Sequence, residues 1–133
     1  MANTLAQEVY DSFESTFSDK KEIYESLELQ WLKAAIGRYN MEIAIDEPLK
    51  FDPELLTFSE ELDQYVIDTL GQMIRQLYQE REYSRVTKIA SIVGKELSVN
   101  GTNGLQKYSK DELAYHESKT SDMIENQKPT ALI

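Results

Sequence analysis

The sequence predicts a mostly α-helical fold: a bundle of four to five helices with one long central helix and a small β-hairpin near residues 95–108. Two observations predict the helices: apolar side chains recur at helical spacing, and no proline occurs between residues 54 and 128. A third predicts the hairpin, because two Asn-Gly pairs lie between short alternating stretches. We expect residues 1–128 to form one domain and residues 129–133 an extended C-terminal tail.

Residues 3–17 predict the first helix, because their apolar side chains recur every fourth residue and share one face. These side chains are Leu5, Val9, Phe13 and Phe17. Residues 20–43 give the clearest helical pattern of the chain. Its apolar face contains Ile23, Leu27, Trp31 and Tyr39. We interpret Gly37, inside this second helix, as the point where another helix crosses closely, with a hinge as the alternative.

Residues 44–58 predict a surface loop, because each of their two prolines favours an extended conformation in the residue before it. The expected apolar anchors of this loop are Leu49, Phe51 and Leu55. Thr57 and Glu60 have the spacing of a capping box and predict the start of the third helix. Apolar spacing then continues to about residue 92, as one helix or as two helices with a kink near residue 84.

The stretches 96–100 and 105–109 flank the sequence GTNG and predict the two strands of the hairpin. Ser109 and Glu112 have capping-box spacing and predict the start of the last helix. The apolar stripe of that helix is thin and includes the polar residues His116 and Thr120.

Composition excludes several classes of protein. The chain has 24 acidic against 14 basic residues, and its net charge of −10 opposes general binding to DNA, RNA or anionic membranes. Cysteine is absent, so disulfides, thiolate catalysis and cysteine-ligated metal centres are excluded. No apolar run approaches the roughly 20 residues that span a bilayer, and the N-terminus does not resemble a signal peptide. We expect a soluble, cytosolic protein.

No motif in the sequence predicts catalysis. His116 is the only histidine, and a lone helical histidine is typical of a surface or boundary position. Gly101, Gly104 and Lys107 lack the spacing and the strand-to-helix context of a phosphate-binding loop. The carboxylates follow no calcium-loop pattern and predict a solvated acidic surface. The sequence therefore predicts no enzyme, no cofactor and no metal site.

Two segments are candidates for contact with a partner. The hairpin turn offers Asn100, Gly101, Asn103 and Gly104. The tail offers Pro129, Thr130, Ala131, Leu132 and Ile133, which either pack on the chain's own core or extend to a neighbouring molecule. The eight tyrosines and one tryptophan predict core packing first and a self-association surface second.

The order of these segments resembles that of the head–tail connector proteins (adaptor or neck proteins) of tailed bacteriophages. The resemblance spans about residues 28–128 and rests on apolar spacing and turns. The stretches that carry it are WLKAAIGRYNMEI, FDPELLTFSEELD, REYSRVTKIASIVGKELSVNG and LAYHESKTSDMIENQK.

The resemblance implies a structural virion protein, made in the host cytoplasm, that forms a homo-oligomeric ring, commonly of twelve copies. Such a ring binds the portal protein on one side and a tail or second neck protein on the other. DNA passes through its channel without specific binding, which suits the acidic composition. The alternative is a small soluble helical module that binds and regulates another protein. Neither interpretation involves a membrane or a cofactor.

Overall fold

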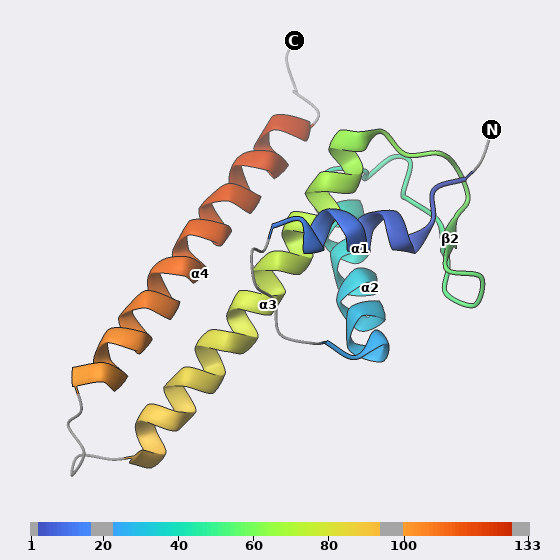
Figure 1. Cartoon of the computed structure of the whole chain (residues 1–133). Coiled ribbons are helices and arrows are strands. Elements are labelled where there is room, and N and C mark those ends of the chain that lie inside the picture. Colours follow the sequence, from blue (N-terminus) through green and yellow to red (C-terminus); the bar gives the residue numbers. More distant parts are fainter. Residues whose placement is uncertain (1–2, 17–22, 94–99, 129–133) are drawn as a thin grey trace.

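The computed structural model describes residues 3–16, 23–93 and 100–128, and Figure 1 shows a mostly helical chain. Within these residues lie the helices α1 (Ala6–Glu14), α2 (Glu25–Glu42), α3 (Gln64–Val93) and α4 (Asn100–Gln127). Two short antiparallel strands, β1 (Phe51–Asp52) and β2 (Thr57–Phe58), form a hairpin. The predicted mostly α fold, the long central helix and the presence of a small hairpin are confirmed.

The position of the hairpin is not the one predicted. Residues 100–108 belong to α4, and residues 95–99 lie outside the described part of the chain. Ser109 and Glu112 are therefore interior residues of a helix and do not cap its start. The Asn-Gly pair at 103–104 favours a turn in isolation, but α4 lies along α3, and tertiary packing overrides a weak local preference.

The hairpin forms where the sequence predicted an irregular loop. Asp52 shapes its turn, because its Oδ1 accepts hydrogen bonds from the backbone N–H groups of Glu54 (2.9 Å) and Leu55 (3.2 Å). Phe51 packs on the core as predicted, whereas Leu55 is exposed and is not an anchor. Thr57 pairs with Asp52 in the sheet, so the capping box predicted at Thr57 is wrong and α3 starts later, at Gln64.

The core lies where α1 and α2 pack against the first half of α3. Figure 1 shows both shorter helices beside this part of α3. Phe13 of α1, Trp31 of α2 and Tyr78 of α3 meet there, with ring centroids 6.2–6.5 Å apart. Edge-on and tilted aromatic contacts of this kind add to the free energy that burial alone supplies. Three helices are thus joined by one aromatic cluster.

A close helix crossing occurs at Gly71 of α3 and not at Gly37. A Cβ atom at Gly71 would lie 2.8 Å from Ser12 Oγ and 3.0 Å from the backbone nitrogen of Phe13. At Gly37 no heavy atom lies within 4 Å of the Cβ position among the described residues, so the predicted crossing there is wrong. Gly71 therefore allows α1 to approach α3 backbone to backbone.

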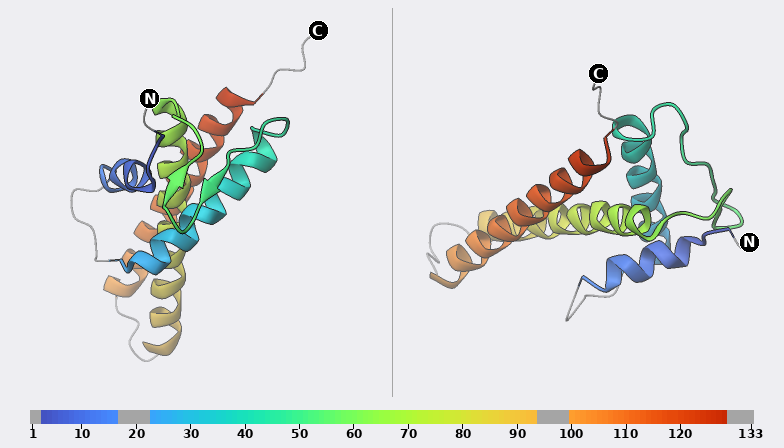
Figure 2. Two further views of the ribbon diagram at one scale, coloured as in Figure 1. Left: turned by 90° about the vertical axis from the view of Figure 1, so that its right-hand side faces the viewer. Right: turned by 90° about the horizontal axis from the view of Figure 1, so that it is seen from above.

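The region predicted as one or two helices is a single helix, α3, which runs from Gln64 to Val93. The right-hand view of Figure 2 shows α3 and α4 side by side, extending well past α1 and α2. We call residues 80–93 of α3 and 100–111 of α4 the distal pair. This arrangement leaves the distal pair projecting from the core-bearing part of the molecule.

Candidate functional site

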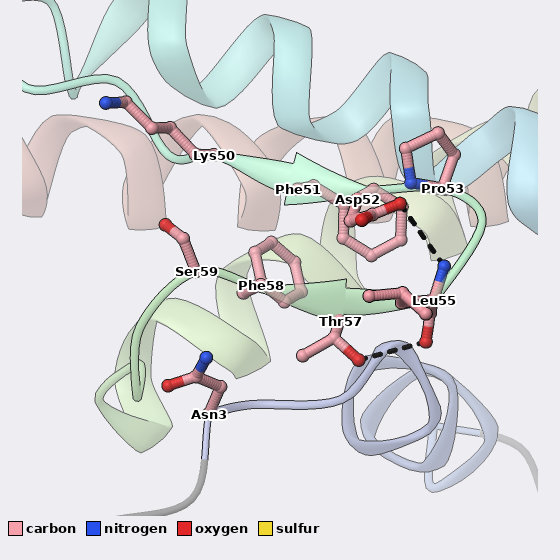
Figure 3. Close-up of a pocket in the computed structure, with 9 residues that line it drawn as sticks. All are labelled: Asn3, Lys50, Phe51, Asp52, Pro53, Leu55, Thr57, Phe58 and Ser59. Carbon is pink, nitrogen blue, oxygen red and sulfur yellow. Dashed lines mark hydrogen bonds between the residues drawn. The ribbon is translucent and has the colours of Figure 1, made fainter.

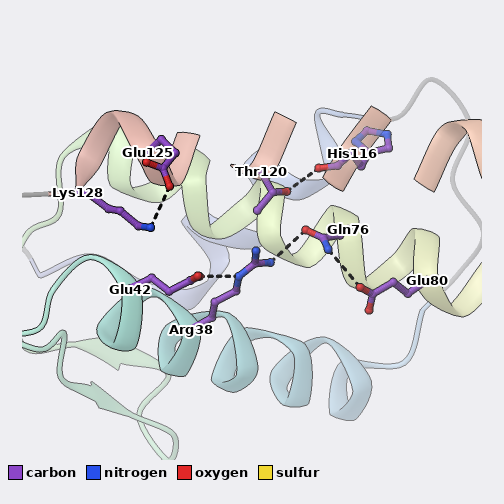
Figure 4. Close-up of polar contacts among 8 residues, drawn as sticks. All are labelled: Arg38, Glu42, Gln76, Glu80, His116, Thr120, Glu125 and Lys128. Carbon is purple, nitrogen blue, oxygen red and sulfur yellow. Dashed lines mark hydrogen bonds and ion pairs between the residues drawn. The ribbon is translucent and has the colours of Figure 1, made fainter. Parts of the chain in front are cut away.

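A polar cluster joins α3 to α4 next to the core. Gln72 Nε2 lies 3.0 Å from His116 Nδ1, and Thr120 Oγ1 donates to the backbone carbonyl of His116 at 2.7 Å. An amide nitrogen can only donate, so Nδ1 of His116 accepts and the ring proton lies on Nε2. Figure 4 shows His116 and Thr120 on neighbouring turns of α4. His116 is buried, so the interpretation of a surface or boundary residue is wrong.

Burial and neighbouring positive charge keep the ring of His116 neutral. Burial, with smaller contributions from the positive charges of Arg75 and Lys119, lowers the pKa of His116 to about 4. Glu112 Oε2 lies 3.5 Å from His116 Nε2 and 4.0 Å from Arg75 Nη2. Burial likewise lowers the pKa of Arg75, although Glu112 acts in the opposite direction. One carboxylate therefore faces both basic side chains, an arrangement that holds α4 in register on α3.

A second polar chain ties the end of α4 to two other helices. The hydroxyl of Tyr39 in α2 donates to Gln127 Oε1 at 2.9 Å, and Gln127 Nε2 bonds to Thr69 Oγ1 of α3. Arg38 of α2 reaches Gln76 of α3 at 3.1 Å. Hydrogen bonds between part-buried side chains restrict the relative positions of these helices. Both polar clusters thus have a structural role.

The side chains that the structure describes in the distal pair are mostly not buried. Of its side chains that the structure describes, those of residues 80–88 and 107–111, Val86 and Ser109 are the buried ones. Thr87 and Ser109 each bury a hydroxyl oxygen for which the described residues supply no hydrogen-bond partner. Tyr108 is 63% exposed. These described residues of the distal pair therefore present helix surface that is only thinly packed within one molecule.

Only one of the two predicted contact segments lies in the described part of the chain. Asn100, Gly101, Asn103 and Gly104 lie in the first two turns of α4, at the end of the distal pair. They are brought together on one helix and not on a projecting hairpin. The predicted tail contacts, residues 129–133, lie outside the described part of the chain. Contact with a partner remains a prediction for both segments.

The hairpin borders a hollow of about 490 Å³ that the sequence did not predict. Figure 3 shows its lining, in which the rings of Phe51 and Phe58 lie near Leu55. Leu56, next to it, adopts a positive φ of 53°, which is uncommon outside glycine, asparagine and aspartate. Pro53 is the sequence signal for a turn here, but spacing gives no sign of the hollow. Its lining is largely apolar and offers no catalytic set.

An acidic hollow lies between α1 and α2. Tyr10, Glu14, Glu25 and Glu28 contribute to its lining. Burial raises the pKa of Tyr10 to about 12, with smaller contributions from Glu28 and Glu25. No group of three or more potential metal-ligating side chains occurs within residues 3–16, 23–93 and 100–128.

The tyrosines divide between the core and the surface. Tyr39 and Tyr78 are buried, as core packing predicts. Tyr24, Tyr65 and Tyr115, like Tyr108, are exposed. Core packing therefore explains only some of the tyrosines, and a self-association surface stays a prediction.

In the part of the chain that the structure describes, no helix has the length and apolar character that crossing a bilayer requires. Comparison with protein-family models, with curated proteins and with solved structures found no match to this chain.

Proposed function

We propose that this chain is a structural subunit of a virion, a head–tail connector that assembles into a ring between the portal and the tail of a bacteriophage. The distal pair is the observation that carries this proposal. Two helices that project from a core gain stability mainly when an apolar face is buried. The side chains that the structure describes in the distal pair, those of residues 80–88 and 107–111, bury little within one molecule. Contact between neighbouring copies would bury more of it.

Ring closure requires a head-to-tail contact, in which one surface of a subunit binds a different surface of the next. The distal pair supplies one such surface, with Tyr108 as an aromatic anchor of the kind enriched at protein interfaces. Asn100, Gly101, Asn103 and Gly104, at the start of α4, lie within the same surface. A different surface of the neighbouring copy supplies the other, away from the start of α3 where Tyr65 lies.

The acidic composition supports a role beside passing DNA. A net charge of −10 on each copy multiplies around a ring and gives a channel wall that repels phosphate. The proposal therefore includes no specific DNA contact. It also includes no cofactor and no catalysis.

A matched pair of variants tests the contact surface. Tyr108→Glu places a charge on the distal pair and should abolish self-association. Tyr65→Glu places the same charge near the start of α3, far from the distal pair, and should leave self-association intact. Both tyrosines are exposed, so both variants should keep the melting temperature of the wild type. Sedimentation velocity on the full chain measures association. Equal association of the two variants would contradict the assignment of this surface.

A further inference from the structure

An exposed apolar surface lies at the C-terminal end of α2. Met41 and Ile45 are 79% and 64% exposed, and they line a hollow of about 550 Å³ together with Glu42, Asp46 and Lys128. Two large apolar side chains that share one hollow form a site that burial would stabilise. We call Met41, Ile45 and this hollow the α2-end surface.

The chain leaves α4 at the edge of this surface. Lys128 follows the last residue of α4 and itself contributes to the lining of the hollow. The hydrogen bond between Tyr39 and Gln127 holds the end of α4 against α2. A hydrogen bond to Glu125 raises the pKa of Lys128, and the charge of Glu42 acts in the same direction. Figure 4 shows Lys128 and Glu42 at the same end of the two helices.

The residues that follow Lys128 have the composition of a segment that can fill this hollow. Proline at position 129 disfavours continuation of a helix. Ala131, Leu132 and Ile133 are apolar. Five residues span at most about 17 Å when extended. Because the hollow begins at Lys128 itself, this reach is sufficient to cover Met41 and Ile45.

We infer that residues 129–133 dock on the α2-end surface of their own molecule and cover Met41 and Ile45. The tether favours the chain's own segment over that of a second copy, because a short linker gives an effective concentration in the millimolar range. Electrostatic repulsion between two chains of charge −10 acts in the same direction. The inference does not rest on the proposed connector function.

Thiol reactivity measures whether the surface is covered. The chain has no cysteine, so Met41→Cys introduces a single thiol at an exposed position. Its reaction with a water-soluble disulfide reagent should be at least threefold slower in the full chain than in the same variant truncated after Lys128. Adding Leu132→Asp to the full chain should restore the fast rate. Tyr108→Cys is the control, and its rate should be the same in both chain lengths. Equal rates for Met41→Cys in both lengths would overturn the inference.

Cross-linking identifies the molecule that provides the segment. Oxidation of the double variant Met41→Cys/Leu132→Cys should give an intramolecular disulfide, seen by mass spectrometry of the monomer. The control Tyr108→Cys/Leu132→Cys should form none. Tyr108 and Lys128 are separated by 20 residues, about 30 Å of helix, beyond the reach of the segment. A disulfide between two chains would overturn docking within one molecule and assign the segment to a second copy. The absence of any disulfide would overturn docking altogether.

Discussion

At the scale of single residues, the contact between α1 and α3 depends on the missing side chain of Gly71. We predict that Gly71→Ala destabilises the fold by about 1–3 kcal/mol, because the new methyl group meets Ser12 Oγ and the backbone of Phe13. Gly37→Ala is the matched control. It should stabilise α2 by about 1 kcal/mol, since its position has open space. Urea unfolding followed by circular dichroism measures both, and a Gly71→Ala variant as stable as the wild type would contradict this packing.

His116 gives a second prediction at this scale, for the effect of pH. Its pKa is lowered from an ordinary value near 6.5 to about 4 in the folded chain. Between these pH values the unfolded chain binds the proton more readily than the folded chain does. The stability that neutral His116 contributes to the fold is therefore fully present above about pH 6.5 and is lost as the pH falls towards 4. We therefore predict that His116→Asn costs stability at pH 7 and costs less at pH 4.5.

Urea unfolding at the two pH values measures this difference. Thr120→Val is the control, because it removes a hydrogen bond to the backbone of the same residue but no titrating group. Its cost should be the same at pH 7 and pH 4.5. A cost of His116→Asn that does not change with pH would show that the histidine titrates normally in the folded chain.

At the scale of elements, the hairpin is held by its turn. We predict that Asp52→Ala destabilises the chain by about 1 kcal/mol, because two backbone N–H groups of the turn lose their acceptor. Glu54→Ala removes a neighbouring exposed carboxylate and should change the melting temperature much less. Thermal unfolding compares the two. If both variants melt at the same temperature, Asp52 does not shape the turn.

The elements also show what sequence can and cannot predict in this chain. Apolar spacing correctly predicted α1, α2 and α3, because burial of a helix face selects a period that the sequence displays. The true hairpin has strands of only two residues and depends on Asp52 and on a bridge between Leu5 and Thr57, which no periodicity reveals. Gly71 was missed because its neighbours in space belong to α1.

The candidate surfaces were predicted less well, because they too depend on contacts between elements that are distant in the sequence. The Asn-Gly pair at 103–104 marked a segment that lies in the distal pair, but as helix and not as hairpin. The thin packing of the described side chains in that pair, and the hollow at the end of α2, depend on how the helices end relative to one another. Such relations appear only when the elements are placed in space.

At the scale of the whole molecule, charge should oppose assembly and salt should favour it. Each copy carries a net charge of −10, so neighbouring copies repel. We predict that self-association strengthens between about 0.05 M and about 0.5 M sodium chloride, because the screening length falls severalfold. Sedimentation velocity at both concentrations measures this. Association that weakens with salt would indicate a contact held by opposite charges and not by the exposed tyrosine of the distal pair.

Native mass spectrometry of the full chain, alone and mixed with the portal protein from the same genome, tests the proposed function most directly. Including the portal protein matters, because a connector subunit can remain monomeric until it meets the surface on which it assembles. We predict a closed ring of one fixed copy number, twelve by the resemblance to connector proteins, in at least the mixed sample. A strict monomer in both samples would contradict it and leave the alternative, a small helical module that binds another protein.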